Sequence, residues 1–158
     1  MNPILLRLWQ LPLPRSVRRL AGAVALHPVV QRLVFPRFAV GIVGIIRDGD
    51  RYLLLRHTYR HTYPWGLPTG FLEHGEQPVD ALRREIREEV GLHVEVTRLL
   101  ATYIDMERPD LVNVVYGGNL IGGEFVASPE VSEYGLFSID ELPPMLPEQL
   151  QLLDLGGF

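Results

Sequence analysis

The chain has 158 residues, of which 47% are hydrophobic and 22% charged, as is ordinary for one globular domain. It contains no cysteine, which excludes disulfides, thiolate zinc sites and cysteine nucleophiles. All 15 basic residues are arginine, so lysine is excluded as a nucleophile or Schiff base. Any side-chain cation that binds phosphate must therefore be arginine or protonated histidine.

The charge is unevenly distributed along the chain. Residues 1–38 carry six arginines and no acidic residue, so the net charge of −4 leaves −10 for residues 39–158. Apolar runs at residues 4–8, 20–26 and 29–35 are separated by prolines and predict two or three short amphipathic helices. None reaches the ~20 apolar residues that span a bilayer, so we expect no transmembrane segment. The pattern predicts a basic, apolar helical arm over residues 1–37 and a domain over residues 38–158.

The function of this arm is open between several classes. Arg18 and Arg19 before an alanine-rich run resemble a twin-arginine export signal, but the run ends at His27 before a proline, and we expect a cytoplasmic protein. We favour packing on the domain or on a partner subunit, which leaves a homodimer open, over attachment to anionic lipid. We expect no nucleic-acid partner, because the arm lacks a helix-turn-helix pattern and the whole chain is acidic.

Strands begin after residue 38. Residues 39–46 are rich in valine, isoleucine and glycine, and residues 48–50 (Asp-Gly-Asp) form a turn signal before the apolar residues 52–55. This spacing predicts a β-hairpin.

A polar, aromatic and basic run at residues 56–63 follows the hairpin. Arg56, Arg60 and Tyr63 are candidate substrate-binding residues, since arginine pairs with phosphate and an aromatic ring stacks on a base. The alternative is a surface loop. Trp65 we expect to lie in the core.

The next stretch, residues 70–92, is predicted to contain a helix from Pro78 to Val90. Leu82, Ile86 and Val90 recur every four residues and form one apolar stripe. Pro78 suits the first turn of a helix, and Gly91 suits the position after its end.

Three carboxylates lie off this stripe, at Glu85, Glu88 and Glu89. Their spacing gathers them on one patch, where like charges repel each other. A solvated acidic face is the ordinary interpretation. A hard divalent cation such as Mg²⁺ (or Mn²⁺) explains the patch better, since Mg²⁺ binds a few carboxylates and completes its coordination with water and substrate phosphate.

The same stretch resembles the Nudix box, G-x5-E-x7-R-E-U-x-E-E-x-G-U, where U is aliphatic. Every fixed position is filled, by Gly70, Glu76, Arg84, Glu85, Ile86, Glu88, Glu89, Gly91 and Leu92. Residues 65–70 (WGLPTG) resemble the W-x-L-P-G-G lead-in of the family, with Thr69 where glycine is usual. The resemblance implies a Nudix-type α/β/α sandwich with a mixed β-sheet.

The resemblance also implies roles for individual residues. Glu85, Glu88 and Glu89 would be the catalytic, metal-binding carboxylates, and Glu88 is the simplest candidate for a general base. The backbone carbonyl of Gly70 is a further ligand. Glu76 would steady Arg84 from outside the metal shell. One more acidic ligand is expected from a later loop, at Glu130 or alternatively Glu133.

After this helix the pattern predicts strands at residues 94–104, 111–120 and 133–137, with Gly117-Gly118 and Gly122-Gly123 interrupting the second. Residues 138–141 are expected to open a short helix with a capping box, and residues 148–155 have helical apolar spacing. Strands, one dominant helix, more strands and a final helix indicate a mixed sheet covered on both faces.

The activity implied is metal-dependent hydrolysis of a pyrophosphate bond in a nucleoside diphosphate linked to another moiety, with a small-molecule nucleotide as substrate. A nucleotide sugar, a dinucleotide and a modified nucleoside triphosphate all remain open. Pro109 lies near a proline of ADP-ribose-cleaving relatives, although a turn explains it as well. The alternative from another class is a non-catalytic nucleotide-binding regulatory module on the same fold.

Overall fold

The computed structural model describes residues 14–25, 27 and 36–156. The chain divides into two compact units, residues 1–37 and 38–158. In the first unit the described helix is α2 (Arg15–Ala25). The helices predicted at residues 4–8 and 29–35 lie outside the described residues, and so does part of the run at 20–26. No helix in the described part of the chain is long and apolar enough to cross a membrane.

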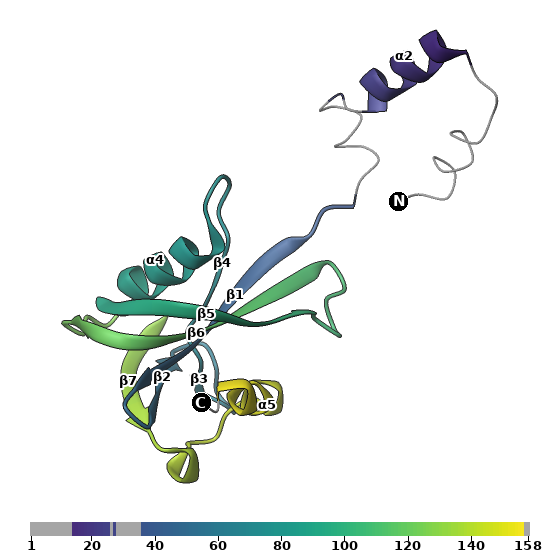
Figure 1. Ribbon diagram of the computed structural model, residues 1–158. Helices are drawn as coiled ribbons and strands as arrows, with labels where there is room; N and C mark the ends of the chain where they lie inside the picture. Colours follow the sequence, from purple (N-terminus) through teal and green to yellow (C-terminus); the bar gives the residue numbers. More distant parts are fainter. Residues whose placement is uncertain (1–13, 26, 28–35, 157–158) are drawn as a thin grey trace. The chain divides into compact units, whose positions relative to one another are not determined.

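The second unit is built on one mixed seven-stranded sheet (Figure 1). The strands are β1 (Ala39–Asp48), β2 (Arg51–His57), β3 (Trp65–Gly66), β4 (Thr69–Phe71), β5 (Leu92–Ile104), β6 (Leu111–Gly123) and β7 (Val131–Phe137). The main path is β3-β2-β1-β6-β5, with β4 paired to β1 and β7 paired to β2. Strands β1 and β6 run parallel, whereas β1–β2, β1–β4 and β5–β6 are antiparallel, so the prediction of a mixed sheet is confirmed.

The predicted hairpin is also confirmed, since β1 pairs antiparallel with β2 around Gly49 and Asp50. Gly49 has φ +63°, a left-handed conformation that glycine adopts without steric cost. Strand β1 changes partner along its length: Asp48 faces Arg51 of β2, while residues 41–43 pair with β4.

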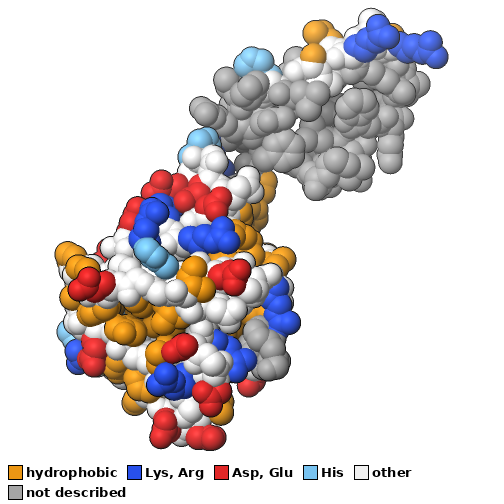
Figure 2. All heavy atoms as spheres, turned by 60° about the vertical axis from the view of Figure 1, so that its left-hand side comes forward, with side chains coloured by type: hydrophobic (Ala, Val, Ile, Leu, Met, Phe, Trp, Pro, Cys, Tyr) orange, Lys and Arg blue, Asp and Glu red, His pale blue; other side chains and the backbone are white. Residues whose placement is uncertain are grey.

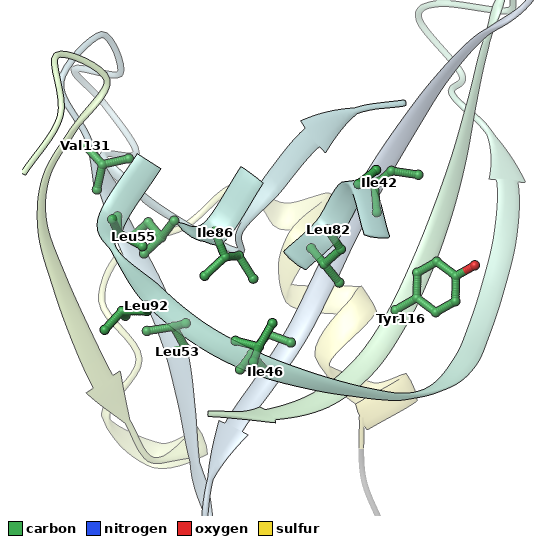
Figure 3. Packing of buried hydrophobic residues seen from close by; sticks show 12 residues of the cluster. Ile42, Ile46, Leu53, Leu55, Leu82, Ile86, Leu92, Tyr116 and Val131 are labelled. Carbon is green, nitrogen blue, oxygen red and sulfur yellow. The ribbon is translucent and has the colours of Figure 1, made fainter. Parts of the chain in front are cut away.

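Helix α4 (Pro78–Val90) has the bounds predicted from the sequence. Gly91 ends it with φ +72° and donates its N–H to the Arg87 carbonyl at 3.0 Å. Leu82 and Ile86, with Ala81 and Val90, are buried against the sheet. Figure 3 shows Leu82 and Ile86 directed at the apolar side chains of β1 and β2. The apolar stripe therefore fixes which face of α4 is left for polar side chains.

The other face of the sheet packs against α5 (Pro147–Leu153) and the turn before it. Val43 and Ile45 of β1 point to this side, in alternation with Ile42 and Ile46, which face α4. Trp65 packs edge-on against Phe137, with ring centroids 5.0 Å apart. Helices thus cover both faces of the sheet, as predicted (Figure 1).

Several predicted boundaries were wrong. Gly117 and Gly118 lie inside β6, where a Cβ at residue 118 would overlap the Glu95 carbonyl of β5, so close strand packing explains this glycine. Strand β7 begins at Val131 rather than at 133. Residues 139–141 form a 3₁₀ turn, η1 (Ile139–Glu141), without a capping box, since Ser138 Oγ bonds the Glu141 carboxylate at 2.9 Å.

Candidate active site

The loop between β4 and α4 is bound to the helix by one arginine. Arg84 donates from Nε to Glu76 Oε1 at 2.9 Å and from Nη2 to Glu76 Oε2 at 3.0 Å, a bidentate pair. Its Nη2 also donates to the Phe71 carbonyl at 3.1 Å. The Arg84 hydrogen bond lowers the pKa of Glu76 below its ordinary value. Both side chains are largely shielded, at 17% and 18% exposure, so this pair fixes the loop.

Glu85 lies directly against Gly70. Its Oε1 accepts the backbone N–H of Phe71 at 3.1 Å and lies 3.1 Å from Arg84 Nη1. A Cβ atom at position 70 would overlap Cγ and Cδ of Glu85. Glycine is therefore required here for the helix carboxylate to reach the backbone of β4.

A cleft of about 450 Å³ opens beside this contact. Residues of β1, β4, β6 and α4 and of the loops around Tyr59 and Glu130 line it. Its charged lining residues are Arg60, Glu85, Glu89 and Glu130. In Figure 2, which brings the α4 side forward, acidic (red) and arginine (blue) side chains lie next to each other on this part of the domain. The topology thus brings together carboxylates that are far apart in the sequence.

The cleft holds more negative than positive charge. Burial, together with the charges of Glu85 and Glu130, raises the pKa of Glu89 to about 7, and Arg60 opposes this shift. Among the described residues no three acidic or histidine side chains converge closely enough to hold a metal ion by themselves. Such a donor set fits Mg²⁺, which takes one or two carboxylates, retains several waters and completes its coordination with substrate phosphate.

The other predicted site residues lie in different places. Glu88 is not among the lining residues: its side chain is 57% exposed and lies 3.5 Å from Arg84 Nη1. Arg56, which lies 3.5 Å from Ser132 Oγ, and the exposed Tyr63 also lie outside the cleft lining. Glu133 is opposite Arg56 in the β2–β7 pairing. Of the two loop candidates, Glu130 therefore reaches the cleft.

Two lining residues were missed in the sequence. Tyr59 precedes Arg60 in the chain and lines the cleft with it. The only sequence feature that could have indicated this residue is the His-Thr-Tyr triplet, which occurs at residues 57–59 and again at 61–63. Asn113 interrupts an apolar strand and is 7% exposed. A polar side chain between valines could have indicated a functional residue, but the alternation of side chains along a strand does not show which of them faces a cleft.

Next to Arg60, the buried His57 has unpaired nitrogens. It is 3% exposed, and within the described residues neither of its ring nitrogens has a hydrogen-bond partner, nor does Nη1 of Arg60. Burial and the charge of Arg60 lower the pKa of His57 to about 4, so the ring is neutral near pH 7.

Comparisons with known proteins identify the family of this chain. The NUDIX domain family matches residues 35–155 of the chain. The chain belongs to the Nudix family. An ADP-ribose pyrophosphatase of Methanocaldococcus jannaschii is 34% identical over 114 residues, which are 68% of this chain and 66% of that protein. An NAD-capped RNA hydrolase NudC of Pseudomonas putida is 30% identical over 112 residues, which are 70% of this chain and 40% of that protein.

Solved Nudix structures share the fold. The crystal structure of an ADP-ribose pyrophosphatase from Streptococcus suis superimposes with a TM-score of 0.65 at 30% identity, covering 76% of this chain and 92% of that one. The chain spans slightly less than two thirds of the archaeal relative and well under half of the NudC protein.

Proposed function

We propose that this Nudix protein hydrolyses the P–O–P bond of a nucleoside diphosphate linked to another group, in a reaction that requires Mg²⁺ (or Mn²⁺). The observation that carries the proposal is the convergence of Glu85, Glu89 and Glu130 with the backbone of Gly70 at one cleft. Carboxylates gathered at one cleft favour a bound cation, and the charge of a pyrophosphate substrate favours one as well.

The box glutamates Glu85, Glu88 and Glu89, the Gly70 carbonyl and Glu130 are the residues that would hold the ion. The chemistry that such an ion would supply is neutralisation of the pyrophosphate charge and a lower pKa for a nucleophilic water. Glu88 fits the role of proton acceptor, because its exposed carboxylate has only one long contact, 3.5 Å from Arg84.

The remaining residues position this set. Arg84, held by Glu76, keeps the segment from Gly70 to Gly75 (the glycine loop) on α4. It thereby fixes the distance between Gly70 and Glu85. Arg60 is the arginine of the cleft lining and would pair with a substrate phosphate. Tyr59, on the same lining, offers an aromatic face to a base or sugar.

The names of the relatives suggest which substrate class to test first. The Methanocaldococcus protein is named for ADP-ribose and the Pseudomonas protein for NAD-capped RNA, both of which contain two groups joined by a pyrophosphate. We infer that ADP-ribose and reduced or oxidised NAD are the first substrates to test here.

The test uses the purified full chain with Mg²⁺ or Mn²⁺ and a panel of ADP-ribose, NADH, nucleotide sugars and modified nucleoside triphosphates. We expect nucleoside monophosphate products from at least one diphosphate-linked compound, and complete loss of turnover in excess EDTA. Turnover that persists in EDTA would contradict the role of the metal. Tight nucleotide binding without any turnover would support a regulatory binding module instead.

A further inference from the structure

A second cavity, of about 690 Å³, adjoins the first. The two share the lining residues Val43, Thr69 and Asn113, which lie on three adjacent strands of the sheet. The second cavity extends from there between the end of β5 and α5. A substrate whose pyrophosphate lies beside Glu89 therefore has space for one of its end groups on the α5 side.

The two cavities differ in the charges that line them. The first has Arg60 among its carboxylates, whereas the charged lining of the second, within the described residues, is acidic throughout: Asp105, Glu107 and Glu148. One oxygen of Asp105 accepts the backbone N–H groups of Glu107 and Arg108, both at 2.9 Å, which fixes that carboxylate in a turn. No arginine or histidine of the described chain lines this cavity to receive an anion.

The rest of the second cavity offers apolar surface and hydrogen-bonding groups. Leu146 and Leu152 of the α5 region and Ile104 of β5 supply the apolar surface. Burial and the charges of Asp105 and Glu148 raise the pKa of Tyr103, so its phenol stays protonated as a donor. A ligand with an apolar ring and N–H or O–H groups complements this lining.

Asn113 stands at the junction of the two cavities. It is more than nine-tenths buried, and in the described part of the chain its side-chain amide makes no hydrogen bond. A Cβ atom at position 41 would overlap its Oδ1, so Gly41 provides the room that this amide occupies. An amide that lines both cavities and makes no bond within the described chain is available to a ligand, and a ligand that bonds it gains a hydrogen bond.

We propose, on the basis of the hydrolase function above, that this carboxylate-lined cavity selects an end group that is uncharged or cationic and carries hydrogen-bond donors. An end group with an additional phosphate is rejected. Asn113, at the junction, is a specificity-determining residue. A phosphate in this cavity would meet three carboxylates and, among the described lining residues, no cation, so like-charge repulsion would weaken its binding.

The experiment compares matched substrates that differ by one phosphate. The full chain is assayed with Mg²⁺ on ADP-ribose, its adenosine 2′-phosphate and its terminal 1″-phosphate, and on NADH against NADPH. Placing the phosphate on either end covers both orientations of the substrate. We expect kcat/KM to be lower by about tenfold or more for the compound whose phosphate enters the cavity, mainly through KM.

Charge reversal in the cavity tests the cause of this selectivity. Glu148→Arg should reduce the preference for the phosphate-free compound by about fivefold or more, because it supplies the missing cation. The matched control is Glu95→Arg, at an exposed position of β5 outside both cavities, which should leave the preference unchanged.

Asn113→Leu separates binding from structure. It removes an amide that makes no hydrogen bond within the described chain, so the melting temperature should change little, while KM for the phosphate-free substrate rises by about tenfold with kcat little changed. A fall in stability with unchanged KM would make Asn113 structural and overturn its role. Equal hydrolysis within every pair, or turnover only of other compounds in the wider panel, would overturn the selectivity but leave the proposed function intact. Hydrolysis of no compound in either set would overturn the function itself.

Discussion

The two polar regions next to the glycine loop differ in how completely their charges are paired. Around Arg84, the guanidinium bonds Glu76 twice and the Phe71 carbonyl once, so the charge of Glu76 is paired within the protein. At the cleft beside Glu89, the charged lining is three carboxylates and one arginine. Arg60 and the nearby His57 have buried nitrogens without a hydrogen-bond partner among the described residues. The first region therefore holds the loop before α4 in place, whereas the second leaves charged and polar groups available to the cation and substrate of the proposed function.

The largest expected effect is that of Glu89→Gln. Turnover should fall by about two to three orders of magnitude, because a metal-positioning carboxylate acts on the transition state. Without metal the variant should be as stable as wild type or slightly more so, since one of several like charges is gone. The Mg²⁺-induced rise in melting temperature should largely disappear. Glu95→Gln, remote from the cleft, serves as the control, and normal turnover in Glu89→Gln would refute the distinction between the regions.

The next effect concerns pH and His57. The pKa of His57 in the folded chain, about 4, lies below the pKa of an unfolded histidine. Between these two pKa values the unfolded chain binds a proton at His57 that the folded chain does not bind, so the free energy of unfolding decreases as the pH falls. Between about pH 7.5 and pH 5, wild type should lose about 2 kcal/mol relative to His57→Leu. Urea unfolding at both pH values measures this difference. His93→Leu, at an exposed histidine, should follow wild type.

A smaller loss is expected from Arg84→Gln, which breaks the bonds to Glu76 and Phe71. The free energy of unfolding should fall by about 1–2 kcal/mol, with or without Mg²⁺. Its neighbour provides the control, since Arg83 pairs with Asp80 on the exposed side of the same helix, at 3.2 Å. Arg83→Gln should change stability by about 0.5 kcal/mol at most. Equal effects of the two variants would show that the Arg84 network does not hold the loop.

The smallest effect is expected from deletion of residues 1–35. Both polar regions and both cavities are built from residues after 38. The shortened chain should therefore remain folded, with its Mg²⁺-dependent activity and melting temperature nearly unchanged. Circular dichroism and the same hydrolysis assay measure this. Loss of activity in a well-folded shortened chain would assign the N-terminal arm to the site.

Local signals predicted the parts of the fold that depend on neighbouring residues. Pro78 and Gly91 set both ends of α4, and the turn at Gly49 set the hairpin, because caps and turns are determined within a few residues. Gly118 was misread, because its reason is the carbonyl of Glu95 on a paired strand. Sequence alone carries no information on which strand that is.

The site shows the same division. The box supplied Gly70, Glu85 and Glu89, all within one loop and one helix, and their place in the cleft follows from that local unit. Asn113 and Tyr59 enter the cleft through strand pairing and a long loop, so periodicity did not identify them. Glu88, Arg56 and Tyr63 lie outside the cleft lining, and their roles remain predictions.

The parallel pairing of β1 with β6 has a consequence for the folding pathway. It joins residues 39–47 to residues 111–119, across the glycine loop, α4 and β5, and both cavities border on this pair. Contacts between such distant segments require a long loop to close, which has a high entropic cost, so they generally form late in folding. Ligand affinity should consequently emerge at the last step of folding, after α4 and the hairpin have formed, so nucleotide binding can serve as a kinetic probe of the completed sheet.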